Sequence, residues 1–125
     1  MEQRKPELKQ RTRNFAGGVV RFYTALPLRR TEVAVLGKQL LRSGTSVAAN
    51  YREASRARSA DEFIAKIELC SQEADETQLW LELLRDDCGL KHQELDVLWT
   101  EADELIAIFV TMSKNTKARK LKPEN

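Results

Sequence analysis

The feature that most constrains this chain is a heptad pattern between residues 63 and 88. Small or apolar side chains recur there at spacings that alternate between four and three residues: Phe63, Ile67, Cys70, Ala74, Thr77, Leu81, Leu84 and Cys88. Such a pattern is typical of an α-helix packed against other helices. Ser59 and Glu62 have the spacing of a capping box, and Gly89 is a natural stop. We therefore expect a helix over residues 60–88, roughly 45 Å long at 1.5 Å per residue.

Three further segments carry helical spacing, and we expect helices at about residues 6–26, 32–57 and 91–115. Thr31 is the expected N-cap of the second of these helices. Its interior contains Ser43-Gly-Thr-Ser46, a stretch of poor helix formers. That stretch is either a loop between two short helices or part of one bent helix. The spacing from Leu40 to Val47 is one heptad and favours the single helix, while residues 116–125 are expected to form a basic, frayed tail.

Four helices with short connections predict an all-α fold, an antiparallel up-down-up-down four-helix bundle built as a single domain over residues 1–125. The length fits one domain. Only five Gly and three Pro occur in 125 residues. This composition argues against sandwiches and barrels, which need many turns.

The residues that commonly carry chemistry are sparse. His92 is the only histidine, and no Glu precedes it by three residues, so a di-metal carboxylate site is not expected. Cys70 lies on the apolar pattern and is expected to be a buried thiol. No Gly-rich phosphate loop is present. We expect a protein that is not an enzyme and that has no cofactor and no metal.

No stretch approaches the roughly 18 consecutive apolar residues of a membrane span, and the N-terminus lacks the apolar region of a signal peptide. The expected location is the cytoplasm, without membrane attachment.

Charge is strongly segregated along the chain, although the net charge is only +2. The net charge is +4 over residues 1–28, +5 over residues 29–60, −11 over residues 61–104 and +4 over residues 105–125. Such segments can pair within the bundle, pair between copies or contact a polyanion.

Basic side chains cluster in the second predicted helix and just after it. These candidate nucleic-acid contacts are Arg42, Arg52, Arg56, Arg58 and Lys66. Guanidinium groups suit phosphate because they form bidentate hydrogen bonds. The alternative is that they pair with the acidic segment that follows.

Three blocks of this chain resemble the bacterial four-helix-bundle family also called 23S rRNA intervening-sequence proteins or S23 ribosomal proteins. The blocks are residues 43–54 (SGTSVAANYREA), 56–66 (RARSADEFIAK) and 73–84 (EADETQLWLELL). The resemblance covers about residues 14–113. It implies an antiparallel four-helix bundle, commonly a homopentamer, with no known enzyme activity.

A related branch, the accessory variability proteins of diversity-generating retroelements, shares the bundle and binds nucleic acid. That branch is strongly basic, whereas residues 61–104 of this chain are acidic.

The positions that match the family pattern are expected to be structural. They include Ser46, Asn50, Glu53, Ser59, Phe63, Glu73, Glu76 and Trp80. We expect Glu73 and Glu76 to pair with Arg52 and Arg56, within one chain or between subunits. The expected function is therefore an oligomeric scaffold that binds RNA or DNA, and the alternative is an adaptor whose partner is another protein.

Overall fold

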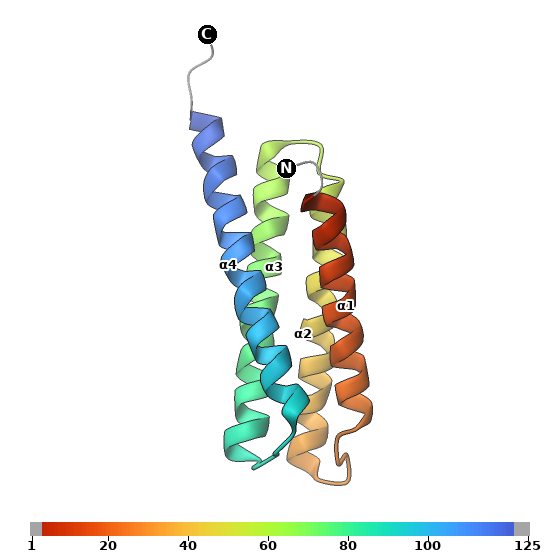
Figure 1. Cartoon of the computed structure of the whole chain (residues 1–125). Coiled ribbons are helices and arrows are strands. Elements are labelled where there is room, and N and C mark those ends of the chain that lie inside the picture. The colour runs from red at the N-terminus through yellow and green to blue at the C-terminus, as the bar shows by residue number, and fades with distance from the viewer. Residues whose placement is uncertain (1–3, 122–125) are drawn as a thin grey trace.

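The computed structural model describes residues 4–121. It contains four long α-helices: α1 (Arg4–Thr24), α2 (Thr31–Ser55), α3 (Ala60–Glu82) and α4 (Gln93–Leu121). Successive helices run antiparallel and lie side by side, and α1 begins at the end of the bundle where α2 connects to α3 (Figure 1). The predicted all-α four-helix bundle is confirmed, and the described residues include no strand.

The second helix is continuous through residues 43–46, so the loop alternative is excluded. The small residues in this stretch serve close packing. Gly44 is buried, and a Cβ placed on it would lie only 2.7 Å from a methyl carbon of Val19 in α1. A side chain at this position would force α1 and α2 apart.

Two helix starts differ in detail from the expectation. Thr31 is the first residue of α2 and not its N-cap, because Arg30 occupies that position and makes no side-chain capping bond. Ser59 does cap α3, and its hydroxyl accepts a 3.0 Å hydrogen bond from the Glu62 amide. Glu62 in turn accepts from the amide of Arg58, 3.1 Å away, and not from that of Ser59 as a standard capping box would have it.

The helical stretch that begins with α3 stops just before Gly89, as expected, but its last turn is π-helical. After Glu82 the chain widens into a π-helical turn over Leu83–Asp87. Gly89 then adopts a positive φ of 71°, and the Leu90 amide donates to the Leu84 carbonyl oxygen at 3.0 Å. This arrangement is a glycine-dependent helix stop.

The expectation of a frayed tail from residue 116 is wrong for residues 116–121, which continue α4. Thr116 is buried, and the Lys117 ammonium lies 2.7 Å from the Glu68 carboxylate of α3. Lys120 forms an ion pair with Asp61 at the start of α3. The basic side chains thus find acidic partners on α3, which extends the helix beyond the apolar pattern. Residues 122–125 lie outside the described part of the chain.

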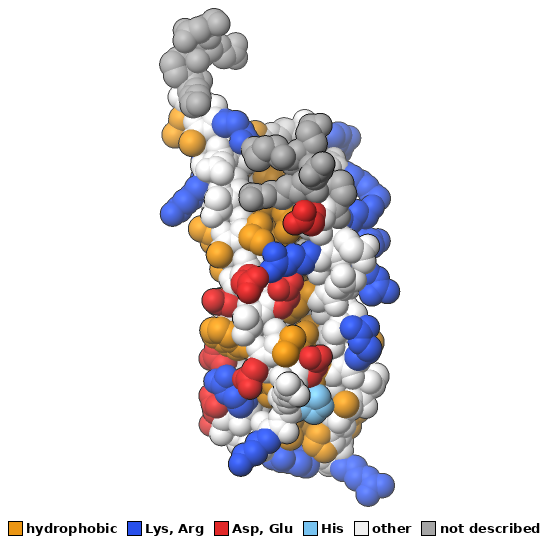
Figure 2. Space-filling model, in the orientation of Figure 1, with side chains coloured by type: hydrophobic (Ala, Val, Ile, Leu, Met, Phe, Trp, Pro, Cys, Tyr) orange, Lys and Arg blue, Asp and Glu red, His pale blue; other side chains and the backbone are white. Residues whose placement is uncertain are grey.

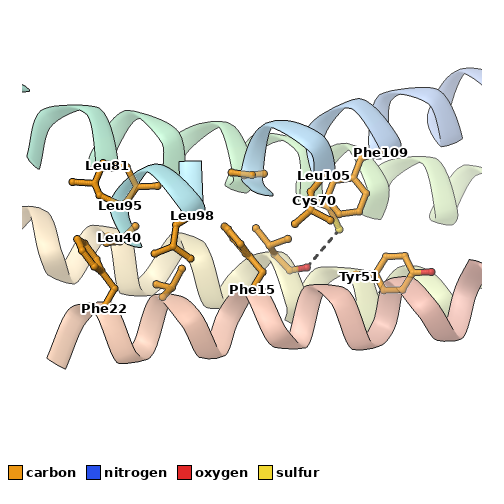
Figure 3. Packing of buried hydrophobic residues seen from close by; sticks show 14 of the residues in the cluster. Phe15, Phe22, Leu40, Tyr51, Cys70, Leu81, Leu95, Leu98, Leu105 and Phe109 are labelled. Carbon is orange, nitrogen blue, oxygen red and sulfur yellow. Dashed lines mark hydrogen bonds between the residues drawn. The ribbon is translucent and has the colours of Figure 1, made fainter. Parts of the chain in front are cut away.

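The core follows the predicted heptad positions. Figure 3 shows Phe15, Phe22, Tyr51 and Phe109 among the leucines that fill the centre. Tyr51 and Phe109 stack with their ring centroids 6.3 Å apart. The Cys70 thiol points at the Val47 carbonyl oxygen, 3.8 Å away, so it contributes to packing as expected.

Candidate nucleic-acid interface

The basic cluster predicted from the sequence divides into two groups, and the first group is paired. The Arg42 guanidinium lies 2.5 Å from Glu76 and 3.2 Å from Glu73, both on α3. The Lys66 ammonium of α3 lies 2.5 Å from Glu53 of α2. Because their charge is compensated within the chain, the candidate interface does not include Arg42 and Lys66.

These pairs also perturb ionisation. The hydrogen bond that Arg42 donates to Glu76 is the main reason that the pKa of Arg42 is raised, and the hydrogen bond that Lys66 donates to Glu53 raises the pKa of Lys66 in the same way. Both basic groups are therefore held in their charged form and tie α2 to α3.

The second group is Arg52, Arg56 and Arg58, which are exposed and form no ion pair within residues 4–121. Arg52 lies in the last turn of α2, Arg56 is its C-cap, and Arg58 lies in the connection to α3. The negative end of the helix dipole favours positive charge at this place. The dipole offers only partial compensation, so the three guanidiniums remain able to bind an anion from solution.

The expected pairing of Glu73 and Glu76 with Arg52 and Arg56 is wrong within the chain. The antiparallel register explains this, because the Ser43 and Thr77 hydroxyl oxygens lie 2.8 Å apart and set Arg42 beside Glu76. Arg52 lies ten residues further along α2, about 15 Å away at 1.5 Å per residue.

Three other matched positions, Asn50, Phe63 and Trp80, lie on α2 and α3. The Asn50 side-chain amide donates to the Ser46 carbonyl oxygen at 3.0 Å, the structural hydrogen bond expected of a mid-helix Asn. Phe63 packs half-buried against the core. Trp80 is also half-buried, and its buried indole nitrogen has no hydrogen-bond partner in the described part of the structure.

Sequence reasoning missed the polar contacts that join α4 to its neighbours. The Arg11 guanidinium of α1 donates two hydrogen bonds to the Glu101 carboxylate, at 2.7 and 2.9 Å, and a third to Glu104 at 2.6 Å. The Trp99 indole of α4 donates to Glu82 of α3 at 2.9 Å. The only available signal was that Arg11 and Glu101 lie one turn from core residues of their helices, where side chains border a neighbouring helix.

A groove of about 610 Å³ lies between α1 and α4. Phe15, Gly18, Val97 and Leu98 form its apolar surface, and charged side chains including Arg21 and Glu94 border it. Figure 2 looks onto this side of the molecule, where hydrophobic side chains show between the two helices. Lys and Arg side chains follow the outer edge of α1 in this view, whereas Asp and Glu gather over α4.

Two negative observations apply to residues 4–121. No group of three or more His, Cys, Asp or Glu side chains is placed to hold a metal ion. None of the helices in this range combines the length and apolar character needed to span a bilayer.

The comparisons with known proteins place this chain beside one family model and several solved structures. The family model described as 23S rRNA-intervening sequence protein matches residues 4–111. The crystal structure of a protein of unknown function from the S23 ribosomal protein family of Bacteroides thetaiotaomicron is similar, with a TM-score of 0.77 and 34% sequence identity. That match covers 85% of this chain and 97% of the other. A search of curated proteins finds no significant match.

Proposed function

The chain belongs to the 23S rRNA-intervening sequence protein family, and on this premise we propose that it is a cytoplasmic, non-enzymatic scaffold that binds nucleic acid through Arg52, Arg56 and Arg58. The observation that carries the proposal is the contrast within the predicted basic cluster. Arg42 and Lys66 are paired with carboxylates, whereas these three exposed guanidiniums have no ion-pair partner in the described structure.

The acidic segment does not abolish this basic surface, because much of its charge is used inside the bundle. Glu73 and Glu76 are paired with Arg42, Glu68 with Lys117, and Glu101 with Arg11. A phosphate backbone that approaches the α2–α3 connection therefore meets three exposed guanidiniums, and the Glu62 carboxylate beside them accepts a hydrogen bond from the Arg58 amide. Phosphate contacts of this kind give affinity without requiring a particular sequence.

We further propose that several copies assemble, as the family resemblance implies for a homopentamer. A ring would repeat the three guanidiniums once per subunit. Binding to one polyanion would then be multivalent, which raises the overall affinity without any new contact.

The test is fluorescence anisotropy of a labelled, structured RNA titrated with nuclease-treated protein at several salt concentrations. We expect binding that weakens steeply with salt, because each neutralised phosphate contributes a slope of about −0.7 to −0.9 in log K against log salt. The test variant replaces three residues: Arg52→Gln, Arg56→Gln and Arg58→Gln. It should bind at least ~10-fold more weakly and show a shallower salt slope.

The matched control removes the same charge from exposed positions that form no ion pair in the described structure: Arg29→Gln, Lys38→Gln and Lys91→Gln. It should retain most of the affinity. Equal losses in the two triple variants would show non-specific attraction and would overturn the interface assignment. Absence of binding by the natural protein at low salt would overturn the nucleic-acid proposal itself.

An adaptor role without nucleic acid is the second candidate, and the groove between α1 and α4 favours it. The exposed Val97, which lies beside the buried Phe15 and Leu98, offers apolar surface of the kind that a partner helix buries. Val97→Lys places a charge in this surface. It should abolish partner capture if the groove is the docking site, and it should leave RNA binding at the α2–α3 connection unchanged.

A further inference from the structure

Two arginines of α1 converge above one glycine on the outer face of that helix. Arg13 lies one turn before Gly17, and Arg21 lies one turn after it. An ideal Cβ built on Gly17 would lie 2.8 Å from Nη1 of Arg13 and 3.2 Å from Nη1 of Arg21. Both guanidiniums therefore reach the same point, directly above backbone that carries no side chain.

Helix geometry explains the position of the Arg21 side chain but not that of Arg13. Side chains on an α-helix lean toward its N-terminus, so the position of Arg21 over Gly17 is ordinary. The Arg13 side chain must instead extend toward the C-terminus of the helix to reach the same point. The helix dipole likewise favours Arg21 near the end of α1 but gives no reason for Arg13 to approach it.

The guanidiniums of the two arginines repel each other in this arrangement unless an anion lies between them. Two positive charges that approach the same point repel each other even in water. Neither arginine forms an ion pair within the described residues, in contrast to Arg11 on the same helix. Glu94 and Glu101 line the groove that Arg21 also borders, but neither lies within ion-pair distance of it. Glu7 is the only carboxylate in the described part of α1 and lies more than one turn before Arg13.

We propose that Arg13 and Arg21 form a fork that binds one phosphate group above Gly17. A tetrahedral phosphate presents oxygens in several directions, so two guanidiniums can bind it from opposite sides, whereas a carboxylate is matched by a single guanidinium. The missing side chain of Gly17 leaves room for the anion against the helix. The fork lies in the middle of α1, whereas Arg52, Arg56 and Arg58 lie at the end of α2 and in the connection after it, so its test does not depend on them.

The decisive variant is Gly17→Ala, because it keeps both charges. Its Cβ would occupy the point on which the two Nη1 atoms converge and would push the guanidiniums apart. The same substitution replaces a helix-interior glycine by the best helix former, so the thermal midpoint should rise. Weaker phosphate binding together with higher stability cannot be attributed to damaged folding.

The experiment follows the arginine Nε–H resonances of the full chain by NMR during titration with inorganic phosphate. We expect the signals of Arg13 and Arg21 to shift together with one dissociation constant. Arg13→Gln and Arg21→Gln should each weaken binding about 10-fold or more, since a charge-assisted hydrogen bond is lost. Gly17→Ala should weaken it several-fold, and Lys38→Gln should leave it unchanged.

Two results would overturn the proposal: no shift of either signal at tens of millimolar phosphate, or equal weakening by Lys38→Gln and Arg13→Gln. The source of the phosphate is read from further titrations with a nucleoside monophosphate and with an oligonucleotide carrying either a 5′-phosphate or a 5′-hydroxyl. A preference for the 5′-phosphorylated strand that Arg13→Gln removes supports the fork with a nucleic-acid end as ligand. Binding of the mononucleotide without such a preference supports the fork with a small phosphomonoester as ligand.

Discussion

The Ser43 and Thr77 hydroxyl oxygens lie 2.8 Å apart between α2 and α3, both fully buried. Each hydroxyl has one hydrogen to donate. Thr77 donates to the Glu73 carbonyl oxygen of its own helix at 2.8 Å, so Ser43 donates to Thr77. A polar contact at two heptad positions thus fixes the register of α2 against α3, and this register places Arg42 beside Glu73 and Glu76.

Replacing Thr77 by Val tests this contact while nearly preserving shape. The Ser43 hydroxyl would lose its acceptor and fall back on the Leu40 carbonyl oxygen, which lies 3.3 Å away. We expect the free energy of unfolding to fall by about 1–2 kcal/mol. In a urea double-mutant cycle with Ser43→Ala, the two changes should be coupled by about 0.5–1 kcal/mol. Strictly additive effects would show that the two hydroxyls do not interact.

Gly44→Ala tests the close approach of α1 and α2. The new Cβ would meet two methyl carbons of Val19 at 2.7 and 2.8 Å, and the Cβ of this fully buried valine lies 3.1 Å away, so rotating its side chain would not relieve the contact. The overpacking should cost about 1–3 kcal/mol, which outweighs the helix-propensity gain of about 1 kcal/mol. Thermal unfolding measures the effect. Gly17→Ala is the matched control because it faces only flexible arginine ends, and it should raise the midpoint instead.

The fold could be predicted from the sequence because the spacing of the apolar residues, and the continuity of that spacing along each helix, determine it. The heptad positions from Ile67 to Leu84 are buried, and the phase across residues 40–47 correctly indicated one helix. The end of α4 could not be predicted, because beyond Met112 its stabilisation comes from the burial of Thr116 and from the ion pairs of Lys117 and Lys120 with α3. Those contacts follow from the tertiary arrangement and leave no apolar periodicity in the sequence.

For the candidate site, the sequence predicted which basic residues take part but not the contacts that they make. Sequence spacing located the arginines but could not say which carboxylate each one meets, because that depends on the register between α2 and α3. Arg42 was therefore grouped with Arg52 although it is paired with α3. The approach of Arg13 to Arg21 depends on side-chain direction, which residue spacing does not specify.

Charge reversal at Glu76 tests the pairing between α2 and α3. Glu76→Lys would place an ammonium beside the Arg42 guanidinium in place of a carboxylate 2.5 Å away. Both side chains are substantially exposed, so we expect a loss of only about 1 kcal/mol in the free energy of unfolding. Arg42→Glu in the same chain should restore most of it. Chemical denaturation at low and high salt measures both effects, and a double variant no better than Glu76→Lys would contradict the pairing.

The buried Cys70 thiol predicts that stability falls at alkaline pH. Burial is the main reason that its pKa rises from the ordinary value of 9.0 to about 12, and burial also raises the pKa of Tyr51 above 10.0. Between pH 9 and pH 12 the unfolded chain loses the thiol proton while the folded chain keeps it. The contribution of this group is therefore fully present below pH 9 and declines as pH rises, by up to about 1.4 kcal/mol per pH unit.

Urea unfolding at half-unit steps from pH 8 to pH 10 measures this decline before the tyrosine contributes strongly. Cys70→Ala is less stable at every pH because it leaves a small cavity. The informative quantity is therefore the slope, which should be shallower than that of the natural chain above pH 9. Cys88 remains in both proteins and cancels in the comparison. Parallel slopes would mean that the Cys70 thiol ionises equally readily in the folded and unfolded chains, contrary to its burial among Val47, Tyr51 and the core of α3.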